Sequence, residues 1–294
     1  MPNDKLKNYF HLHFIIFIWG FTGVLGALIS IDAIPLVWYR MFLAVGFILL
    51  YILLKKIRFK IPKQVLLGLM ATGIIIALHW ITFFMAIKVS NVSVALATIS
   101  TAALFTSILE PIWYKRKLIW YEVFLGLLVI VGLYIIFDVQ KNYVTGIILA
   151  LISAFLAAVF SLINSKYVKE YRASVISFYE LLSGFLFLSI YLLFSGSFNI
   201  NFFSLSTNDW MYLLILASVC TCYAFIAGVH VMKHLSPYTV MLTVNLEPVY
   251  GIILAFTIIG DNEKMNSQFY IGAFIILLTV IANGIMKNFL KKKS

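Results

Sequence analysis

Long apolar runs constrain this fold more than any other feature of the sequence. The hydrocarbon core of a membrane is about 30 Å thick, so a helix needs about 20 apolar residues to cross it. The runs lie at residues 9–29, 34–54, 66–87, 92–113, 119–137, 145–165, 174–194, 210–231, 237–259 and 268–287. Only 11% of the residues are charged, whereas a soluble domain has about 25%. The sequence therefore predicts an all-α integral membrane protein with ten transmembrane helices and no soluble domain.

Basic residues indicate how these helices are oriented. Lys and Arg cluster in every second connection, beginning with the N-terminal segment, as at residues 55–63, 115–117 and 166–172. The intervening connections contain Lys88, Lys141 and Lys264. Because cytoplasmic loops carry the excess of Lys and Arg, both termini are expected in the cytoplasm. This distribution also explains the net charge of +11, so no nucleic-acid partner is expected.

Several enzyme classes lack their motifs in this sequence. It contains no Gly-x-x-x-x-Gly-Lys-Ser/Thr loop, no His-Glu-x-x-His and no Gly-x-Ser-x-Gly, the motifs of nucleotide hydrolysis, zinc proteases and serine hydrolases. The two cysteines, Cys220 and Cys222, stand two positions apart in an apolar run and would point to different faces of a helix. We therefore expect no enzyme, no metal and no cofactor.

The two halves of the chain resemble each other. Tyr39-Arg40-Met41 corresponds to Tyr179-Glu180-Leu181, and Ala86-Ile87-Lys88 corresponds to Val231-Met232-Lys233. Five helices per half is an odd number, so the second half is expected to lie inverted in the membrane, as in many secondary transporters. The sequence therefore predicts two repeats, residues 1–140 and 141–294, around a central cavity.

A known family shares the residues that recur along the chain. Trp19-Gly20 in the first run precedes Pro35 and Arg40, and Leu246-Glu247-Pro248-Val249-Tyr250 follows in the second half. This pattern resembles the EamA family of the drug/metabolite transporter superfamily over nearly the whole chain. The resemblance implies an inverted five-plus-five repeat, a central cavity and ATP-independent transport of small metabolites, here in a bacterial inner membrane. The chain departs from the family at Ala103, where the first repeat often has a proline.

Glu247 and Pro248 stand together in the middle of an apolar run. They lie about ten residues into it, roughly 15 Å deep at 1.5 Å per residue. A carboxylate at that depth costs at least about 2.5 kcal/mol, and irregular backbone is tolerated there when it lines a cavity. We interpret Pro248 as a helix hinge and Glu247 as a group that binds a proton or a cationic part of the substrate. The alternative is a structural kink beside an acid that has a partner in the protein.

Arg40 and Glu180 occupy corresponding places in the two halves. A guanidinium that faces a cavity could bind a carboxylate of the substrate or of Glu247, and Glu180 would supply the opposite charge. Such a pair would suit a zwitterion such as an amino acid. The alternatives are a snorkelling Arg40 and a structural ion pair.

Further residues are candidates for the same site. His79 is a candidate cavity residue or proton relay, and Asn245 needs a partner either in a neighbouring helix or in the substrate. An aromatic wall for an amphipathic substrate is expected from Trp19, Tyr39, Tyr179 and Tyr250. Glu110, just before a basic connection, is interpreted as an interfacial acid, and its role, like those of Glu180 and His79, is left open between function and structure.

These observations predict a secondary transporter, an exporter, of a small metabolite such as an amino acid or an amphipathic compound. It would work by alternating access between its two halves, with protons as a candidate coupling ion and the lipid bilayer as its surroundings. Neither the substrate nor the oligomeric state follows from the sequence. The alternative is a membrane-embedded enzyme or a non-transporting assembly factor whose buried charges are structural.

Overall fold

The computed structural model of the protein describes residues 2–115, 120–139 and 141–291. The predicted all-helical architecture is confirmed in these residues. The helices are α1 (Pro2–Leu28), α2 (Ala33–Leu54), α3 (Lys63–Val89), α4 (Val92–Ile99), α5 (Ala102–Tyr114), α6 (Trp120–Val139), α7 (Val144–Tyr167), α8 (Ala173–Phe194), α9 (Ile200–Phe203), α10 (Thr207–Ile215), α11 (Ala224–Val231), α12 (Pro237–Val244), α13 (Glu247–Ile259) and α14 (Ser267–Lys291). A π-helix, η2 (Leu216–Tyr223), joins α10 to α11, and short 3₁₀ turns η1 (Lys141–Tyr143) and η3 (Asp261–Glu263) precede α7 and α14.

Helices of membrane-spanning length dominate the part of the chain that the structure describes. Seven stretches there are long and apolar enough to cross a membrane: Lys7–Leu28, Ala33–Leu54, Lys63–Val89, Val92–Tyr114, Val144–Tyr167, Ala173–Phe194 and Thr207–Val231. They correspond to seven of the predicted runs. The other three runs contain shorter apolar helices, at Phe124–Ile136, Glu247–Ile259 and Ser267–Thr279.

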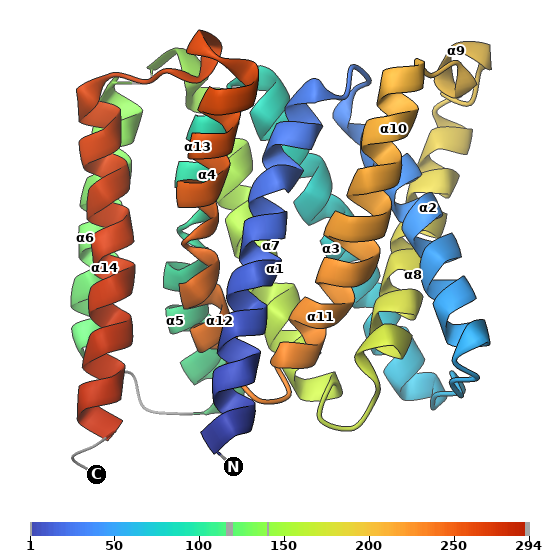
Figure 1. Ribbon diagram of the computed structural model, residues 1–294, viewed down its shortest axis with the longest axis horizontal. Helices are drawn as coiled ribbons and strands as arrows, with labels where there is room; N and C mark the ends of the chain where they lie inside the picture. Colours follow the sequence, from blue (N-terminus) through green and yellow to red (C-terminus); the bar gives the residue numbers. More distant parts are fainter. Residues whose placement is uncertain (1, 116–119, 140, 292–294) are drawn as a thin grey trace.

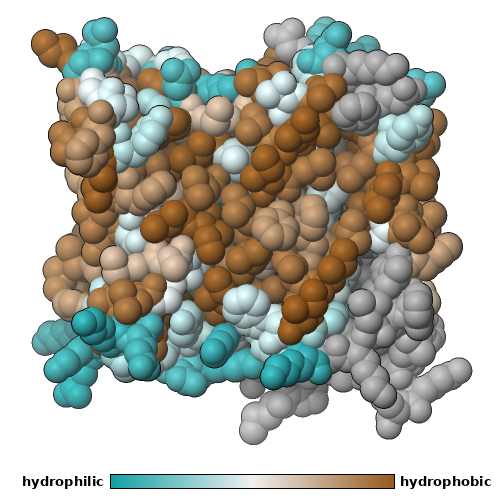
Figure 2. All heavy atoms as spheres, turned by 180° about the vertical axis from the view of Figure 1, so that it is seen from behind, coloured by the Kyte–Doolittle hydropathy of each residue, from teal (hydrophilic) through white to brown (hydrophobic). Residues whose placement is uncertain are grey.

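The long helices run side by side between two polar faces. Helix α1 begins and α14 ends at the same face, which we call the terminal face (Figure 1). Figure 2 shows a broad hydrophobic band between two hydrophilic rims. Large apolar side chains such as Leu54, Phe194 and Ile253 are exposed on the outside of the bundle. In a membrane protein these outer side chains can face lipid, because acyl chains are as apolar as leucine.

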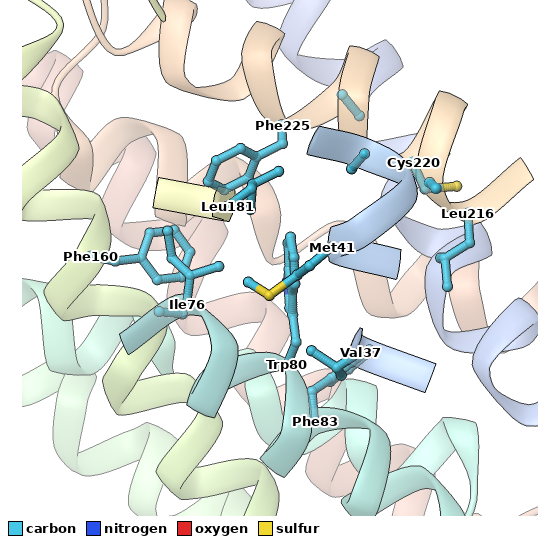
Figure 3. Close-up of a cluster of buried hydrophobic side chains, with 14 of the residues drawn as sticks. Val37, Met41, Ile76, Trp80, Phe83, Phe160, Leu181, Leu216, Cys220 and Phe225 are labelled. Carbon is cyan, nitrogen blue, oxygen red and sulfur yellow. The ribbon is translucent and has the colours of Figure 1, made fainter. Parts of the chain in front are cut away.

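Helices from both halves share one apolar core. Met41 of α2 lies among Ile76 and Trp80 of α3, Phe160 of α7 and Leu181 of α8 (Figure 3). Helices α3 and α8 approach closely, since a Cβ on Gly73 would lie 2.1 Å from the backbone carbonyl oxygen of Glu180. Small residues at helix contacts allow such approaches in membrane proteins.

Two of the predicted spans are interrupted near their middle. The run 237–259 was expected to form one helix with a hinge at Pro248, but it forms α12 (8 residues) and α13 (13 residues), separated at Asn245 and Leu246. Proline lacks a backbone N–H and disfavours helical backbone in the residue before it, so Pro248 lies in the first turn of α13, where it is tolerated.

The first half has the same interruption without a proline. The run 92–113 forms α4 (8 residues) and α5 (13 residues), separated at Ser100 and Thr101. The N–H of Thr101 donates to the Thr98 carbonyl at 3.1 Å, as the N–H of Leu246 donates to the Thr243 carbonyl at 3.0 Å. The hydroxyls of Ser100 and Thr101 also donate to nearby backbone carbonyls, which competes with helical hydrogen bonding.

A carboxylate holds the first broken span in place at the face opposite the termini. Glu263 in η3 accepts hydrogen bonds from the backbone N–H of Val92 at 3.0 Å and from the N–H and hydroxyl of Ser93, both at 2.9 Å. These donors belong to the first turn of α4, where free N–H groups and the helix dipole favour a negative charge. Glu263 therefore fixes the α13–α14 connection to the start of α4.

We expect Glu263→Gln to lower the thermal unfolding midpoint of the purified protein. Hydrogen bonds to charged groups contribute about 1.5–3 kcal/mol each. In the glutamine variant the side-chain NH₂ group would also face the donors of α4 where a carboxylate oxygen now accepts from them. Asp261→Asn is the matched control, because Asp261 lies exposed in the same turn. Equal midpoints for Glu263→Gln and wild type would show that this contact does not stabilise the fold.

Candidate functional site

A small internal cavity lies where the two interrupted spans approach the other helices. Residues from α1, α2, α3, α4, α5, α7, α11, α12 and α13 line it, and so do the interruption residues Ser100 and Asn245. Its volume is about 90 Å³, enough for a few water molecules. Both halves of the chain therefore contribute to the cavity.

Arg40 is the cation of this cavity, and its position depends on the π-helix. The side chain is 2% exposed, and its Nε donates to the Thr221 hydroxyl oxygen at 2.7 Å. Thr221 in turn donates to the carbonyl of Leu216, five residues earlier, at 2.7 Å. The guanidinium carbon lies 3.8 Å from the ring centroid of Trp80, a cation–π contact that is strong when water is excluded. Arg40 therefore does not snorkel to the membrane surface.

Several buried polar atoms of residues that line the cavity lack a protein partner. Among the described residues, no hydrogen bond reaches Arg40 Nη1, Ser161 Oγ or either side-chain amide atom of Asn245. Buried polar groups are nearly always satisfied, and each exception calls for an explanation. Both donors and acceptors are present in this set, so a polar group or an ordered water molecule could pair with it.

Glu247 supplies a carboxyl group to the same cavity. It is the first residue of α13 and is 9% exposed, and the positive end of the helix dipole stabilises a negative charge there. Within the described chain, Arg40 hydrogen-bonds to Thr221 and not to Glu247. Arg40 and Glu247 interact electrostatically without a hydrogen bond between them, and both line the cavity. Pro248, next in sequence, also lines it.

His79 lines the cavity but is engaged by the neighbouring helix α7. Its Nδ1 lies 2.9 Å from the carbonyl oxygen of Ser153 and 2.8 Å from the Ser153 hydroxyl, and that hydroxyl also lies within hydrogen-bonding distance of the His79 carbonyl. These bonds fix the ring between α3 and α7. The structure therefore agrees with a histidine that has a structural partner.

The predicted aromatic wall is only partly at the cavity. Trp19 lines it and packs against Gly228, where an added Cβ would lie 2.8 Å from the indole ring. Tyr39 donates instead to the Phe202 carbonyl at 3.0 Å, and Tyr179 donates to the Phe59 carbonyl at 2.8 Å. Tyr250 packs edge-on against Phe17, with 5.6 Å between ring centroids. The remaining aromatic lining comes from Trp80, Phe83, Phe160 and Phe225.

Glu180 lies outside the lining of this cavity. It is fully buried and accepts a hydrogen bond from Asn164 of α7 at 3.3 Å. The structure thus brings together Trp19, Arg40, His79, Asn245, Glu247 and Pro248, and it places Tyr39, Tyr179, Tyr250 and Glu180 elsewhere.

Sequence reasoning missed the hydroxyl groups of the site. Thr22 and Ser161 line the cavity and Thr221 holds Arg40, yet each is a single small polar residue within an apolar run. Ser and Thr in membrane helices commonly bond to their own backbone, so their type alone does not distinguish them. The only signal in the sequence is that Ser161 and Asn164 recur at helical spacing on one face.

Comparisons with known proteins show the family and the fold of this chain. The sequence profile of a family described as the EamA-like transporter family matches residues 9–138 and again residues 144–284. A protein of Archaeoglobus fulgidus described as an uncharacterized transporter is 25% identical over 287 residues, which cover 95% of this chain and 96% of its own. A second uncharacterized transporter of that organism is 24% identical over 202 residues, covering 68% of this chain and 69% of its own. A solved crystal structure with 14% sequence identity superposes with a TM-score of 0.70 over 95% of this chain and 97% of its own, which indicates a shared fold.

We expect Asn245→Leu to raise the thermal unfolding midpoint. Its amide has no partner in the described part of the protein, and an unsatisfied buried polar group costs about 1–3 kcal/mol. The matched control is Asn164→Leu, which removes the hydrogen bond to Glu180 and should lower the midpoint. If Asn245→Leu destabilised the protein as much as Asn164→Leu, the amide of Asn245 would have a structural partner.

Proposed function

Because this chain belongs to the EamA-like transporter family, we propose that it is a secondary transporter of a small amino-acid-like metabolite. It is a membrane transporter with an unidentified substrate, and the chemistry of the cavity narrows the choice. In this proposal the metabolite carries a carboxylate, an amino group and an apolar side chain. Transport proceeds by alternating access and exports the metabolite.

The observation that carries the proposal is the unpaired set of polar atoms around Arg40. A carboxylate accepts two hydrogen bonds readily, and a guanidinium with a free Nη1 is a suitable donor. The amide of Asn245 offers a second donor from the other half of the chain. Glu247, which lines the same cavity, would bind the amino group. This assignment matches each charge of a zwitterion to a group that the protein leaves available.

The aromatic lining supports an apolar or amphipathic substrate side chain. Trp19, Trp80, Phe160 and Phe225 surround the cavity, and binding sites for small molecules combine such walls with a few placed polar groups. The cavity of about 90 Å³ is smaller than typical ligand pockets of about 300–1,000 Å³. In our proposal the halves therefore move apart to admit the substrate, from one face and then from the other.

We further propose ten membrane crossings arranged as an inverted five-plus-five repeat, with repeats at residues 1–140 and 141–294. The interrupted spans support it, because α4 and α5 correspond in length and in the position of the break to α12 and α13. The N-cap residue Asn91 of the first matches Ser236 in the second, where the Ser236 hydroxyl accepts from the N–H of Thr239. Figure 1 draws α4–α5 and α12–α13 running in opposite directions.

Helix packing has the same pseudo-symmetry. Helix α1 packs against α12 and α13, and its counterpart α7 packs against α4 and α5. Helices α2 and α8, which correspond to each other, are in contact, as are α6 and α14. In the proposed arrangement a two-fold axis in the membrane plane relates these pairs, as in transporters with inverted repeats.

For localisation we propose a bacterial inner membrane with both termini in the cytoplasm. Lys55, Lys56, Arg58 and Lys60 lie between α2 and α3 at the terminal face (Figure 1). Lys264 lies in the connection from α13 to α14, at the opposite face. An excess of Lys and Arg on one face identifies it as cytoplasmic.

Flux in proteoliposomes tests the proposed substrate class. We expect wild type to move phenylalanine faster than phenethylamine, which lacks the carboxylate, and faster than phenylpropanoate, which lacks the amino group. Arg40→Gln should reduce phenylalanine flux at low substrate concentration by about 10–100-fold, because a charge-assisted hydrogen bond contributes about 1.5–3 kcal/mol. Glu247→Gln should reduce it as well and should shift the preference toward phenylpropanoate.

Arg58→Gln is the control for loss of a basic residue, since Arg58 is exposed between α2 and α3. Size-exclusion profiles identify variants that fail to fold. If folded wild type moved no compound from a panel of amino acids and cationic dyes, the proposed substrate class would be wrong. A structural role for the buried charges, in a membrane enzyme or an assembly factor, would then be favoured.

Cysteine labelling in intact cells tests the orientation. Lys264→Cys and Lys60→Cys are placed in a background that lacks Cys220 and Cys222. A membrane-impermeant maleimide should label the cysteine at position 264 and should label that at position 60 only after the cells are opened. The reverse pattern would contradict cytoplasmic termini.

A further inference from the structure

A second buried polar group lies away from the central cavity. Glu180 of α8 and Asn164 of α7 both have 0% exposure, and Asn164 Nδ2 donates to Glu180 Oε2 at 3.3 Å. Ser177, one turn before Glu180 on α8, is also fully buried. This Glu180–Asn164 pair is not part of the cavity that contains Arg40 and Glu247.

The atoms that remain unpaired in this pair are both oxygens. Glu180 Oε1 and Asn164 Oδ1 have no hydrogen-bond partner anywhere in residues 2–115, 120–139 and 141–291. An ionised carboxylate and an amide oxygen are both acceptors, so two such atoms cannot satisfy each other. A proton on Oε1 supplies the missing donor, and an acid and an amide can then share two hydrogen bonds. The pair is therefore complete only when it holds a proton.

No cation of the described chain takes the place of that proton. Helices α2, α3 and α11 pack against α8, and α7 approaches it at Asn164. On these helices Arg40, His79, Tyr39 and Lys88 hydrogen-bond elsewhere, to Thr221, Ser153, Phe202 and Ile29. Tyr167 lies against Gly68, and Tyr51, Lys63 and Lys166 are exposed. His230 of α11, together with Lys233 beyond it, lines a pocket at the terminal face. The only hydrogen bond to the Glu180 carboxyl group among the described residues comes from Asn164. A buried carboxylate without a cation is strongly disfavoured.

Polar side chains lead from this pair in both directions. Ser174, Ser177 and Glu180 recur every three residues on α8 and so lie along one side of it. Ser174 lines the terminal-face pocket, which has a volume of about 720 Å³. In the other direction, Ser161 precedes Asn164 by one turn of α7 and lines the central cavity. The hydroxyls of both Ser177 and Ser161 lack a partner in the described residues.

We propose that the Glu180–Asn164 pair is a proton-binding site between the terminal-face pocket and the central cavity, and that its protonation is coupled to transport. The coupling rests on the proposed function, whereas the proton site itself does not. Ionised Glu180 takes a proton at Oε1 from a hydronium ion at one end of this path, which leaves a water molecule, and becomes neutral. It becomes ionised again when the proton passes to a water molecule at the other end, which becomes a hydronium ion. Ser161 and Ser177 position the waters that carry it.

Infrared difference spectra of the purified protein in lipid, recorded from acid to alkaline pH, test the proton site without any substrate. We expect the C=O stretch of a protonated, hydrogen-bonded carboxyl group in wild type and in Glu247→Gln, and its loss in Glu180→Gln. Glutamine retains the shape of Glu180 and can pair with the Asn164 amide, so this variant should fold. In Asn164→Leu the band should move to higher frequency, because the hydrogen bond from the amide is lost. Spectra of Glu180→Gln identical to wild type would overturn the proton site.

Phenylalanine flux under an imposed pH gradient tests the coupling separately. Glu180→Gln should lose gradient-driven flux and retain exchange of phenylalanine across the membrane without a gradient. Gradient-driven flux equal to wild type in Glu180→Gln would overturn the coupling. A wild type that shows the infrared band but moves no substrate would support the proton site and overturn the proposed function, so the two failures are distinguishable.

Discussion

The whole arrangement depends on one constraint: inside a membrane, each polar group must find its partner within the protein. Arg40 shows how this is met, since one nitrogen bonds to Thr221 while the guanidinium lies against Trp80. Glu263 shows it at the opposite face, where a single carboxylate satisfies the first turn of α4. Against this background of satisfied groups, most of the buried atoms that lack a partner in the described chain belong to residues that line the cavity or lie at the Glu180–Asn164 pair. Those atoms carry the functional interpretation, because a structural role would have given them partners.

The interrupted spans place polar and charged side chains of the cavity near the middle of the membrane-spanning helices. A continuous helix has no free backbone groups in its middle, but an interruption exposes some of them and brings a helix N-terminus to the centre of the membrane. Glu247 begins α13 at such a point, and Asn245 lies in the interruption itself. The matching interruption at Ser100 and Thr101 contributes Ser100 to the same cavity. The two halves thus bring equivalent irregular segments to one place, and the charged residues beside them come from different helices.

Much of this could be predicted from the sequence, and the exceptions have physical reasons. Apolar runs predict membrane helices because the bilayer core requires them. A charged or amide side chain in such a run is rare, and this signal identifies Arg40, Glu247 and Asn245, which line the cavity, but also Glu180, which does not. A tyrosine in an apolar run does not identify a cavity residue, because its ring is equally suited to lining a cavity and to packing between helices. Tyr39 and Tyr179 instead donate hydrogen bonds to backbone carbonyls. The proline explained the interruption before α13, but the equivalent interruption before α5 depends on hydroxyl groups whose hydrogen bonds are visible only in the fold. The partner of Glu180 was likewise hidden, because Asn164 is on another helix.

The π-helix has a consequence for how the two faces of the protein communicate. Thr221 reaches Arg40 from a turn that holds one residue more than an α-helix would, and such turns are typically found at functional positions. If that surplus residue moved from η2 to the far end of α11, the residues that it passes, those of α11 included, would rotate by about 100° and shift by about 1.5 Å relative to α10. Phe225 and Gly228 of α11 face the cavity, while Ala227 and His230 of the same helix face the terminal-face pocket. Such a register shift would couple two changes. Arg40 would exchange its hydrogen bond with Thr221 for one to an incoming anion, and the residues of α11 that line the central cavity and the terminal-face pocket would move at the same time.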